Sequence, residues 1–239
     1  MQANQTWLHQ KIKKLYSTEE NAEQETTIEI NSRNYRIDVL KEQRTAAYEI
    51  QLSNFGQEFS SKIRTLLGAQ LRVIIVHPVA VLEKVIWMSK GEQVGSRTVN
   101  KRADIYTLFD ELVHFKTDFV PDRMGFDVLL TEEAVWKEFI GFRGRTRRPR
   151  YRQIQRDLLH VRETHLIRKK NDFITLLPEN LPPVFTNREL AERLTVQGGK
   201  RRKIRIAGRM TYSLCRLGII DHIGINGRAH EFAIRKNDD

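Results

Sequence analysis

The stretch that decides the fold runs from Tyr35 to Ile75 and reads YRIDVLKEQRTAAYEIQLSNFGQEFSSKIRTLLGAQLRVII. Apolar and polar residues alternate around Asp38 and again around Glu49, with the period of two that is typical of strands. Helical spacing of apolar residues follows from Phe55 to Leu67, and the continuous apolar run from Leu71 to Val76 is typical of a central strand. The stretch therefore predicts strand, strand, helix and strand in succession.

Three polar residues in the two alternating runs predict a metal site. If the strands pair as neighbours, Asp38 lies across from Glu49, and Gln51 shares the face of Glu49. Two carboxylates directly opposite each other repel, so we expect a cation to bridge them. Mg²⁺ suits this role because it binds through one or two carboxylates and takes its other ligands from water and phosphate. A metal there polarises a phosphodiester and supplies hydroxide near neutral pH.

This order of elements, with Asp in one strand and Glu-x-Gln in the next, resembles the PD-(D/E)xK nuclease superfamily, which has the restriction-endonuclease-like fold. The resemblance implies that Asp38 and Glu49 are catalytic metal ligands and that the Ile50 carbonyl adds a further ligand. It implies that Gln51 is catalytic in the place of the family's usual Lys. The implied cofactor is Mg²⁺, for which Mn²⁺ can substitute.

Two positions decide how far the resemblance extends to activity. A Lys in the place of Gln51 would bring a positive charge to the attacking water or the scissile phosphate, whereas Gln51 can only hydrogen-bond. The family often adds a Glu from a preceding helix, and Glu20 or its neighbour Glu19 is the candidate for this third carboxylate. The alternative functional hypothesis is a catalytically inactive DNA-binding regulator or scaffold with a nuclease-like domain.

The charge of the chain indicates a polyanionic partner. Lys and Arg number 41 against 30 Asp and Glu, a net charge of +11, and nucleic acid is the commonest polyanion that attracts such proteins. The densest basic segment is predicted to contain a helix from Tyr151 to Val161 after Pro149, and Tyr151 either stacks on a base or packs internally. The arginines expected to contact DNA phosphates here are Arg145, Arg147, Arg148, Arg150 and Arg152.

The C-terminal residues predict a second, small unit. A capping-box pattern at Thr186 and Glu189 begins a short helix, and a basic loop and a second helix from Arg205 to Leu217 follow. Asn226-Gly227 then marks the turn of a β-hairpin. This order resembles a winged helix-turn-helix, which binds either duplex DNA or protein. Its expected DNA contacts are Lys200, Arg201, Arg202, Arg205, Arg209 and Arg228.

Taken together, the sequence predicts an α/β (α+β) protein with a restriction-endonuclease-like mixed sheet flanked by helices. Residues 1–142 form the nuclease domain, 143–180 an Arg-rich helical connector, and 181–239 the winged-helix domain. The expected function is metal-dependent endonucleolytic hydrolysis of DNA, and RNA remains an alternative substrate. Because one metal site per chain cuts one strand, we expect a homodimer on duplex DNA.

Two further expectations concern the compartment. No apolar stretch approaches the roughly 20 residues of a membrane-spanning helix, and the first residues lack a charged-then-apolar signal pattern. A cytoplasmic location without membrane association is therefore expected. The single cysteine, Cys215, excludes an internal disulfide and a Cys-based zinc site.

Overall fold

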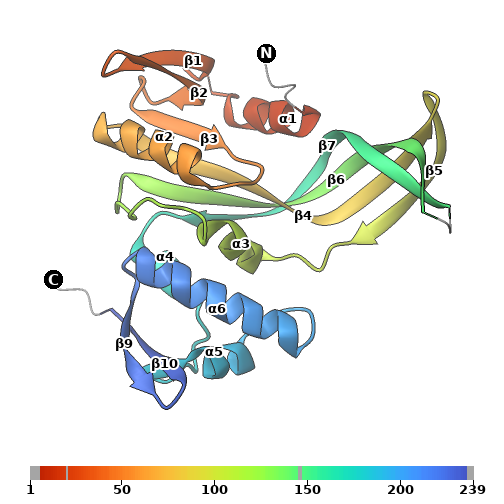
Figure 1. Ribbon diagram of the computed structural model, residues 1–239. Helices are drawn as coiled ribbons and strands as arrows, with labels where there is room; N and C mark the ends of the chain where they lie inside the picture. Colours follow the sequence, from red (N-terminus) through yellow and green to blue (C-terminus); the bar gives the residue numbers. More distant parts are fainter. Residues whose placement is uncertain (1–5, 20, 145–146, 236–239) are drawn as a thin grey trace.

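A large mixed sheet flanked by helices dominates the computed structural model, which describes residues 6–19, 21–144 and 147–235 (Figure 1). Among these residues the sheet has seven strands, β1 (Glu23–Ile30), β2 (Arg33–Lys41), β3 (Ala46–Ile50), β4 (Arg72–Ser89), β5 (Glu92–Asn100), β6 (Met124–Arg143) and β7 (Arg148–Ile167). The strand order is β1-β2-β3-β4-β6-β7, and β5 pairs with β4. β3 and β6 run parallel to β4, and the other pairs are antiparallel. The predicted α+β class is confirmed.

Helices cover both faces of this sheet where β2, β3 and β4 lie (Figure 1). They are α1 (Trp7–Tyr16), α2 (Gln57–Gly68), the 3-10 turn η1 (Ile105–Thr107), α3 (Leu108–Leu112) and α4 (Lys170–Ile174). Leu8 and Ile12 of α1 pack in one core with Val39 and Ile74. α2 belongs to a second and larger core, to which it contributes Ile63. The strands between the two cores are therefore the central layer of the molecule.

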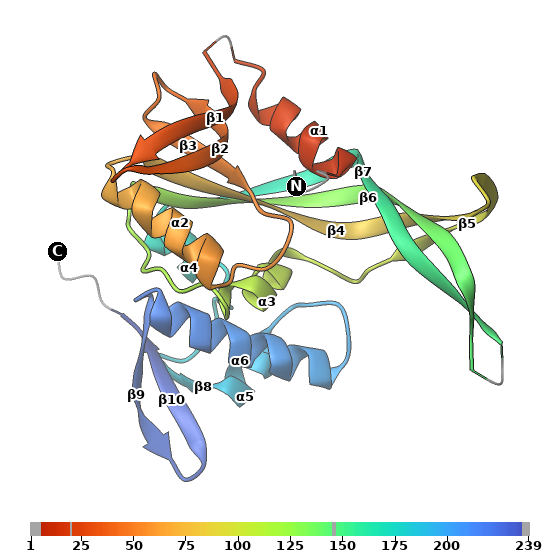
Figure 2. The same ribbon diagram turned by 45° about the horizontal axis from the view of Figure 1, so that its top comes forward.

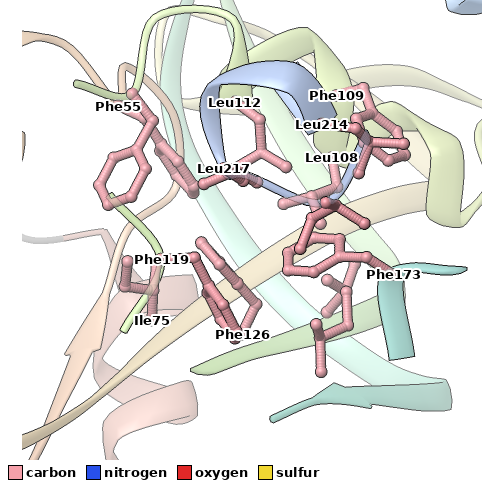
Figure 3. Close-up of a cluster of buried hydrophobic side chains, with 14 of the residues drawn as sticks. Phe55, Ile75, Leu108, Phe109, Leu112, Phe119, Phe126, Phe173, Leu214 and Leu217 are labelled. Carbon is pink, nitrogen blue, oxygen red and sulfur yellow. The ribbon is translucent and has the colours of Figure 1, made fainter. Parts of the chain in front are cut away.

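The C-terminal residues form a smaller unit that shares the larger core. Its elements are β8 (Val184–Thr186), α5 (Asn187–Arg193), α6 (Lys200–Arg216), β9 (Ile220–Asn226) and β10 (Ala229–Ile234), and the three strands pair in the order β8-β10-β9. Leu108 and Phe109 of α3 belong to the same buried cluster as Leu214 and Leu217 (Figure 3). Continuous burial of apolar surface of this kind predicts that the two units unfold together.

The predicted helix from Tyr151 to Val161, within the 143–180 connector, is wrong. These residues lie in β7, which pairs with β6 from Arg148 to Ile167. β7 is an edge strand, where charged residues and Pro149 are tolerated because one side of the strand has no partner in the sheet. Pairing with β6 outweighed the helical propensity of the segment. The sheet therefore extends past residue 142 to Ile167.

Two other predicted boundaries are wrong. The strand predicted from Leu71 to Val76 does not end there, because β4 continues to Ser89. Pro78 lies where β4 passes from its pairing with β3 to its pairing with β5. The predicted basic loop at 200–203 is the first turn of α6, which begins after Gly199. α6 therefore begins with positive charges, which are unfavourable at a helix N-terminus.

The capping box was predicted correctly. Thr186 caps α5 by accepting from the Glu189 N–H, and Glu189 accepts in return from the Thr186 N–H at 2.8 Å. No helix within the described residues combines the length and the apolar character that crossing a membrane requires.

The shared core leads to a prediction for Phe109, which is fully buried at the junction of the two units. We expect Phe109→Ala to lower the free energy of unfolding by roughly 3–5 kcal/mol, and to do so equally for both units. In urea, tryptophan fluorescence reports the sheet and labelling of Cys215 reports α6, so the two midpoints should shift together. Leu159→Ala, an exposed position on β7, is the control with little effect. Separate transitions for the two probes would contradict the shared core.

Candidate active site

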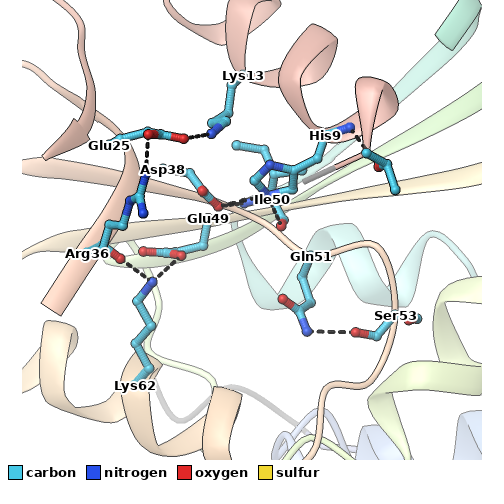
Figure 4. Close-up of polar contacts among 11 residues, drawn as sticks. His9, Lys13, Glu25, Arg36, Asp38, Glu49, Ile50, Gln51, Ser53 and Lys62 are labelled. Atoms are coloured by element: carbon cyan, nitrogen blue, oxygen red, sulfur yellow. Dashed lines mark hydrogen bonds and ion pairs between the residues drawn. The ribbon is translucent and has the colours of Figure 1, made fainter. Parts of the chain in front are cut away.

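An open cavity of about 1120 Å³ lies where β2, β3, α1 and α2 meet. Asp38 from β2 and Glu49 from β3 line it, together with Gln51, His9 from α1 and Lys62 from α2. The side chains approach one another from these four elements (Figure 4). The predicted carboxylate pair is therefore part of a larger polar cluster.

Asp38 and Glu49 come together through the antiparallel pairing of β2 with β3. Val39 is the register partner of Tyr48, so one step further along the antiparallel pair Asp38 lies across from Glu49. The Ile50 N–H donates to Asp38 Oδ2 at 2.9 Å. Burial disfavours the charged form of Asp38, but the hydrogen bond and charge of His9 and the bond from Ile50 outweigh it, and the pKa of Asp38 lies below its usual value. Asp38 is therefore ionised at neutral pH.

Glu49 is a buried carboxylate of the cavity, with 3% of its surface exposed. Its Oε2 accepts from Lys62 Nζ at 2.6 Å. Burial raises the pKa of Glu49, Lys62 lowers it and the charge of Asp38 raises it, and the net result is a pKa of about 7. Its second oxygen, Oε1, is buried without a hydrogen-bond partner among the described residues. One acceptor next to a second carboxylate is thus left for a further cation or donor.

Lys62 is a functional candidate that the sequence reasoning missed. Its Nζ also donates to the Arg36 carbonyl at 2.5 Å, so the ammonium is held between β2 and Glu49. It therefore brings to the site, from α2, the positive charge that Gln51 lacks. Lys62 follows Phe59 by three residues, at the edge of the apolar stripe of α2, and this spacing does not distinguish it from an ordinary surface lysine.

Gln51 is directed into the following loop (Figure 4). Its Nε2 donates to the Ser53 carbonyl at 2.6 Å and to the Asn54 carbonyl at 3.0 Å. The Gln51 carbonyl lies 2.8 Å from Nδ1 of the buried His77. In this arrangement Gln51 fixes the course of the loop beside the cavity.

His9 is the second residue that the sequence reasoning missed. Its Nε2 lies 3.1 Å from the Ile50 carbonyl oxygen and 3.4 Å from Asp38 Oδ2. α1 thus brings an imidazole rather than a carboxylate to this side of the cavity. Of the carboxylates proposed near this helix, Glu19 pairs with Lys41 at 2.8 Å, and Glu20 lies outside the described residues.

The polar groups fit a magnesium ion held by few protein ligands. Among the residues that the structure describes, no group of three or more His, Cys, Asp or Glu side chains is arranged to hold a metal. Mg²⁺ requires only one or two carboxylates, since water and substrate phosphate complete its shell. The unpartnered Oε1 of Glu49, the ionised Asp38 and the nearby Ile50 carbonyl meet that requirement.

The basic residues assigned to DNA by the sequence fall into two regions. Exposed arginines of the first region lie at the β6–β7 hairpin, at positions Arg147, Arg148, Arg150 and Arg152. Arg145 lies outside the described residues. In the C-terminal unit the exposed candidates are Lys200, Arg201, Arg205 and Arg228.

Two of the candidates on α6 contact the protein itself. Arg202 pairs with Asp104 at 3.0 Å, and Arg209 pairs with Asp110 of α3. Both ion pairs join α6 to the large unit. These two arginines therefore help to hold α6 in place.

Comparison with known proteins gives a match over most of the chain. A family model described as a domain of unknown function, DUF8091, matches residues 6–168. The chain belongs to this family. The DUF8091 segment contains His9, Asp38, Glu49 and Lys62 and ends one residue after β7, so the family corresponds to the sheet with its polar cavity. No curated protein and no solved structure matches the chain.

The raised pKa of Glu49 leads to a prediction about stability. Its folded-state pKa of about 7 lies above the ordinary 4.5, so the folded protein retains a proton that the unfolded chain loses. Stability therefore falls as pH rises from about 4.5 through 7, by about 3 kcal/mol for a shift of this size. We expect Glu49→Gln to be more stable than the parent by up to that amount at pH 8, and about equally stable near pH 4, where the carboxyl is protonated in both states.

Urea denaturation with chelator present measures this difference, and Glu133→Gln is the matched control. Glu133 is also fully buried, but Arg156 and Thr131 satisfy its oxygens, so its substitution should destabilise the protein by about 1–3 kcal/mol. A lower free energy of unfolding for Glu49→Gln than for the parent at pH 8 would contradict the view that ionised Glu49 destabilises the folded protein.

Proposed function

We propose that this protein is a magnesium-dependent endonuclease that hydrolyses DNA. The observation that carries the proposal is the convergence of two carboxylates, a backbone carbonyl and a lysine on one open cavity, where a buried carboxylate oxygen has no hydrogen-bond partner in the described part of the chain. Strained burial of charged groups of this kind is characteristic of functional sites, because it lowers stability without a structural benefit.

The order of elements supports a restriction-endonuclease-like core. α1 precedes the antiparallel strands β1, β2 and β3, and α2 then leads to β4, which runs parallel to β3. Asp38 lies in β2 and Glu49 in β3, as the resemblance to the PD-(D/E)xK superfamily implies. We therefore assign the nuclease-like fold to the large unit as part of the proposal.

In the proposed mechanism each residue of the cavity has a defined task. Asp38, Glu49 and the Ile50 carbonyl would hold the Mg²⁺, and a bound Mg²⁺ would polarise the phosphate and make water more acidic. Glu49 binds a cation only after it loses its proton, so binding strengthens as pH rises through about 7. His9 holds Asp38 and the Ile50 carbonyl in position. Lys62 places a positive charge where the phosphate acquires negative charge during attack.

The C-terminal unit supports placement on duplex DNA. Its α5, α6 and β9–β10 hairpin follow the order of a winged helix, and Arg201, Arg205 and Tyr212 lie on the exposed side of α6. Thr211 is buried and donates to Asn187 Oδ1 at 2.7 Å, so it does not face a ligand. In the proposed complex α6 enters the major groove, and Arg228 at the hairpin turn contacts the phosphate backbone.

A catalytically inactive DNA-binding scaffold is the second candidate. The ion pair between Lys62 and Glu49 favours it, because the lysine already neutralises one proposed metal ligand. Gln51, whose amide is bonded to its own loop, favours it as well. The two functions differ in whether the cavity binds a metal and whether the protein cleaves DNA.

Cleavage of supercoiled plasmid with Mg²⁺ or Mn²⁺ at low salt distinguishes them. We expect nicking or linearisation by the parent protein, complete loss in Asp38→Ala and Glu49→Ala, and a loss of about 100-fold or more in Lys62→Ala. Lys11→Ala, whose lysine pairs with Asp157 at 2.8 Å outside the cavity, is the matched control and should retain activity. Tight DNA binding by all of these proteins without cleavage would establish the scaffold instead.

A further inference from the structure

The outer ends of β4, β5, β6 and β7 project beyond the helices (Figure 2). Four aromatic residues form a continuous row there, which we call the aromatic stripe. The ring centroids of Trp87 and Tyr151 are 6.3 Å apart, those of Tyr151 and Phe139 5.8 Å, and those of Phe139 and Phe142 5.1 Å. The stripe thus crosses three strands of the sheet.

The stripe lies on the face of the sheet opposite α1. α1 contacts the sheet through Trp7, whose ring lies 5.5 Å from that of Trp136. Trp87 is the register partner of Lys137, which follows Trp136 in β6, and successive side chains of a strand point to opposite faces. Packing of α1 therefore does not account for the stripe.

Two rings of the stripe are open to solvent. Phe142 is 56% exposed and Tyr151 37% exposed, whereas phenylalanines such as Phe55 and Phe126 in the core are fully buried. Exposed aromatic clusters are unfavourable in water and commonly mark a binding surface. The stripe therefore requires an occupant that offers flat apolar surface.

The charge around the stripe identifies the occupant as a polyanion. Residues 139–154 contain six arginines and no acidic residue. Arg143 and Arg148 are direct cross-strand partners, an arrangement that is destabilising for like charges unless an anion lies between them. The Arg147 guanidinium lies 5.3 Å from the centre of the Phe142 ring. Flat rings and phosphate-binding groups thus alternate within one hairpin.

We propose that the aromatic stripe binds an unpaired DNA strand, with bases stacked on Phe142 and Tyr151 and phosphates bound by the arginines beside them. Unpaired bases expose their flat faces to aromatic side chains, whereas bases in a duplex are already stacked on one another. Arginines alone would be enough to bind duplex phosphates. The exposed rings therefore select a single strand.

This inference rests on the proposed function and names its substrate class, DNA in which a duplex adjoins a single-stranded segment. Along β4, Trp87 lies 11 positions (87 minus 76) beyond Val76, the partner of Ile50. At about 3.3 Å per residue this is at most about 36 Å, close to one turn of duplex DNA. The proposed cleavage site and the stripe are thus spaced to contact one DNA molecule about one turn apart.

Binding measured with chelator present tests the inference without any need for cleavage. The probes are a labelled oligothymidylate of about 12 nucleotides, its abasic counterpart and a duplex of the same length. We expect the full-length chain to bind the oligothymidylate at least about fivefold more tightly than the abasic strand. Phe142→Ala and Tyr151→Ala should each weaken oligothymidylate binding by about five- to 100-fold, with little change for the duplex.

Two controls separate stacking from other causes. Tyr151→Phe retains the ring and should retain binding, and Leu159→Ala removes an exposed apolar side chain elsewhere on β7 and should have no effect. Unchanged oligothymidylate binding in Phe142→Ala and Tyr151→Ala would overturn the inference, as would equal binding of the abasic strand. An equal loss of duplex binding would overturn it in favour of a duplex-binding arm. A negative result in this binding assay would not change the expected result of the cleavage assay. A negative result in the cleavage assay would likewise not change the expected result of this binding assay.

Discussion

The buried carboxylate of Glu49 is the constraint on which the candidate site depends. It is held out of water beside a second carboxylate, and its Oε2 accepts a hydrogen bond from Lys62. Its Oε1 has no hydrogen-bond partner among the described residues. A protein selected for stability alone would favour an uncharged residue at this position. Three other groups of the cavity act on this charge directly or through a neighbour: Lys62 lowers the pKa of Glu49, Asp38 raises it, and His9 contacts Asp38.

The larger core makes this site part of one rigid arrangement. α3 packs between the sheet and α6, and the ion pairs of Arg202 and Arg209 bind α6 to the same side of the molecule. Glu111 of α3 also accepts from the Asn54 N–H at 2.7 Å, in the loop that follows Gln51. The proposed DNA-positioning helix and the loop beside the proposed active site are thus fixed to the same short helix.

Sequence patterns predicted the parts of the structure that short-range order determines. Alternation around Asp38 and Glu49 located β2 and β3 and the facing of the two carboxylates, and the Thr186 capping box located α5. Patterns failed where long-range contacts decide. β7 is an exposed edge strand whose alternation is interrupted by irregularities in its pairing with β6, so the local pattern predicts a helix there. The roles of His9 and Lys62 arise only when α1 and α2 pack against β3, which no local spacing encodes.

Calorimetric titration of the protein with Mn²⁺ near pH 7, in two buffers of different ionisation enthalpy, tests the account most directly. Glu49, with its pKa of about 7, is partly protonated at this pH, so the account predicts that metal binding releases part of a proton. Binding should be lost in Asp38→Asn and in Glu49→Gln, and the proton release with it. Metal binding that releases no proton, or that persists in both variants, would contradict the assignment of this cavity as a metal-dependent active site.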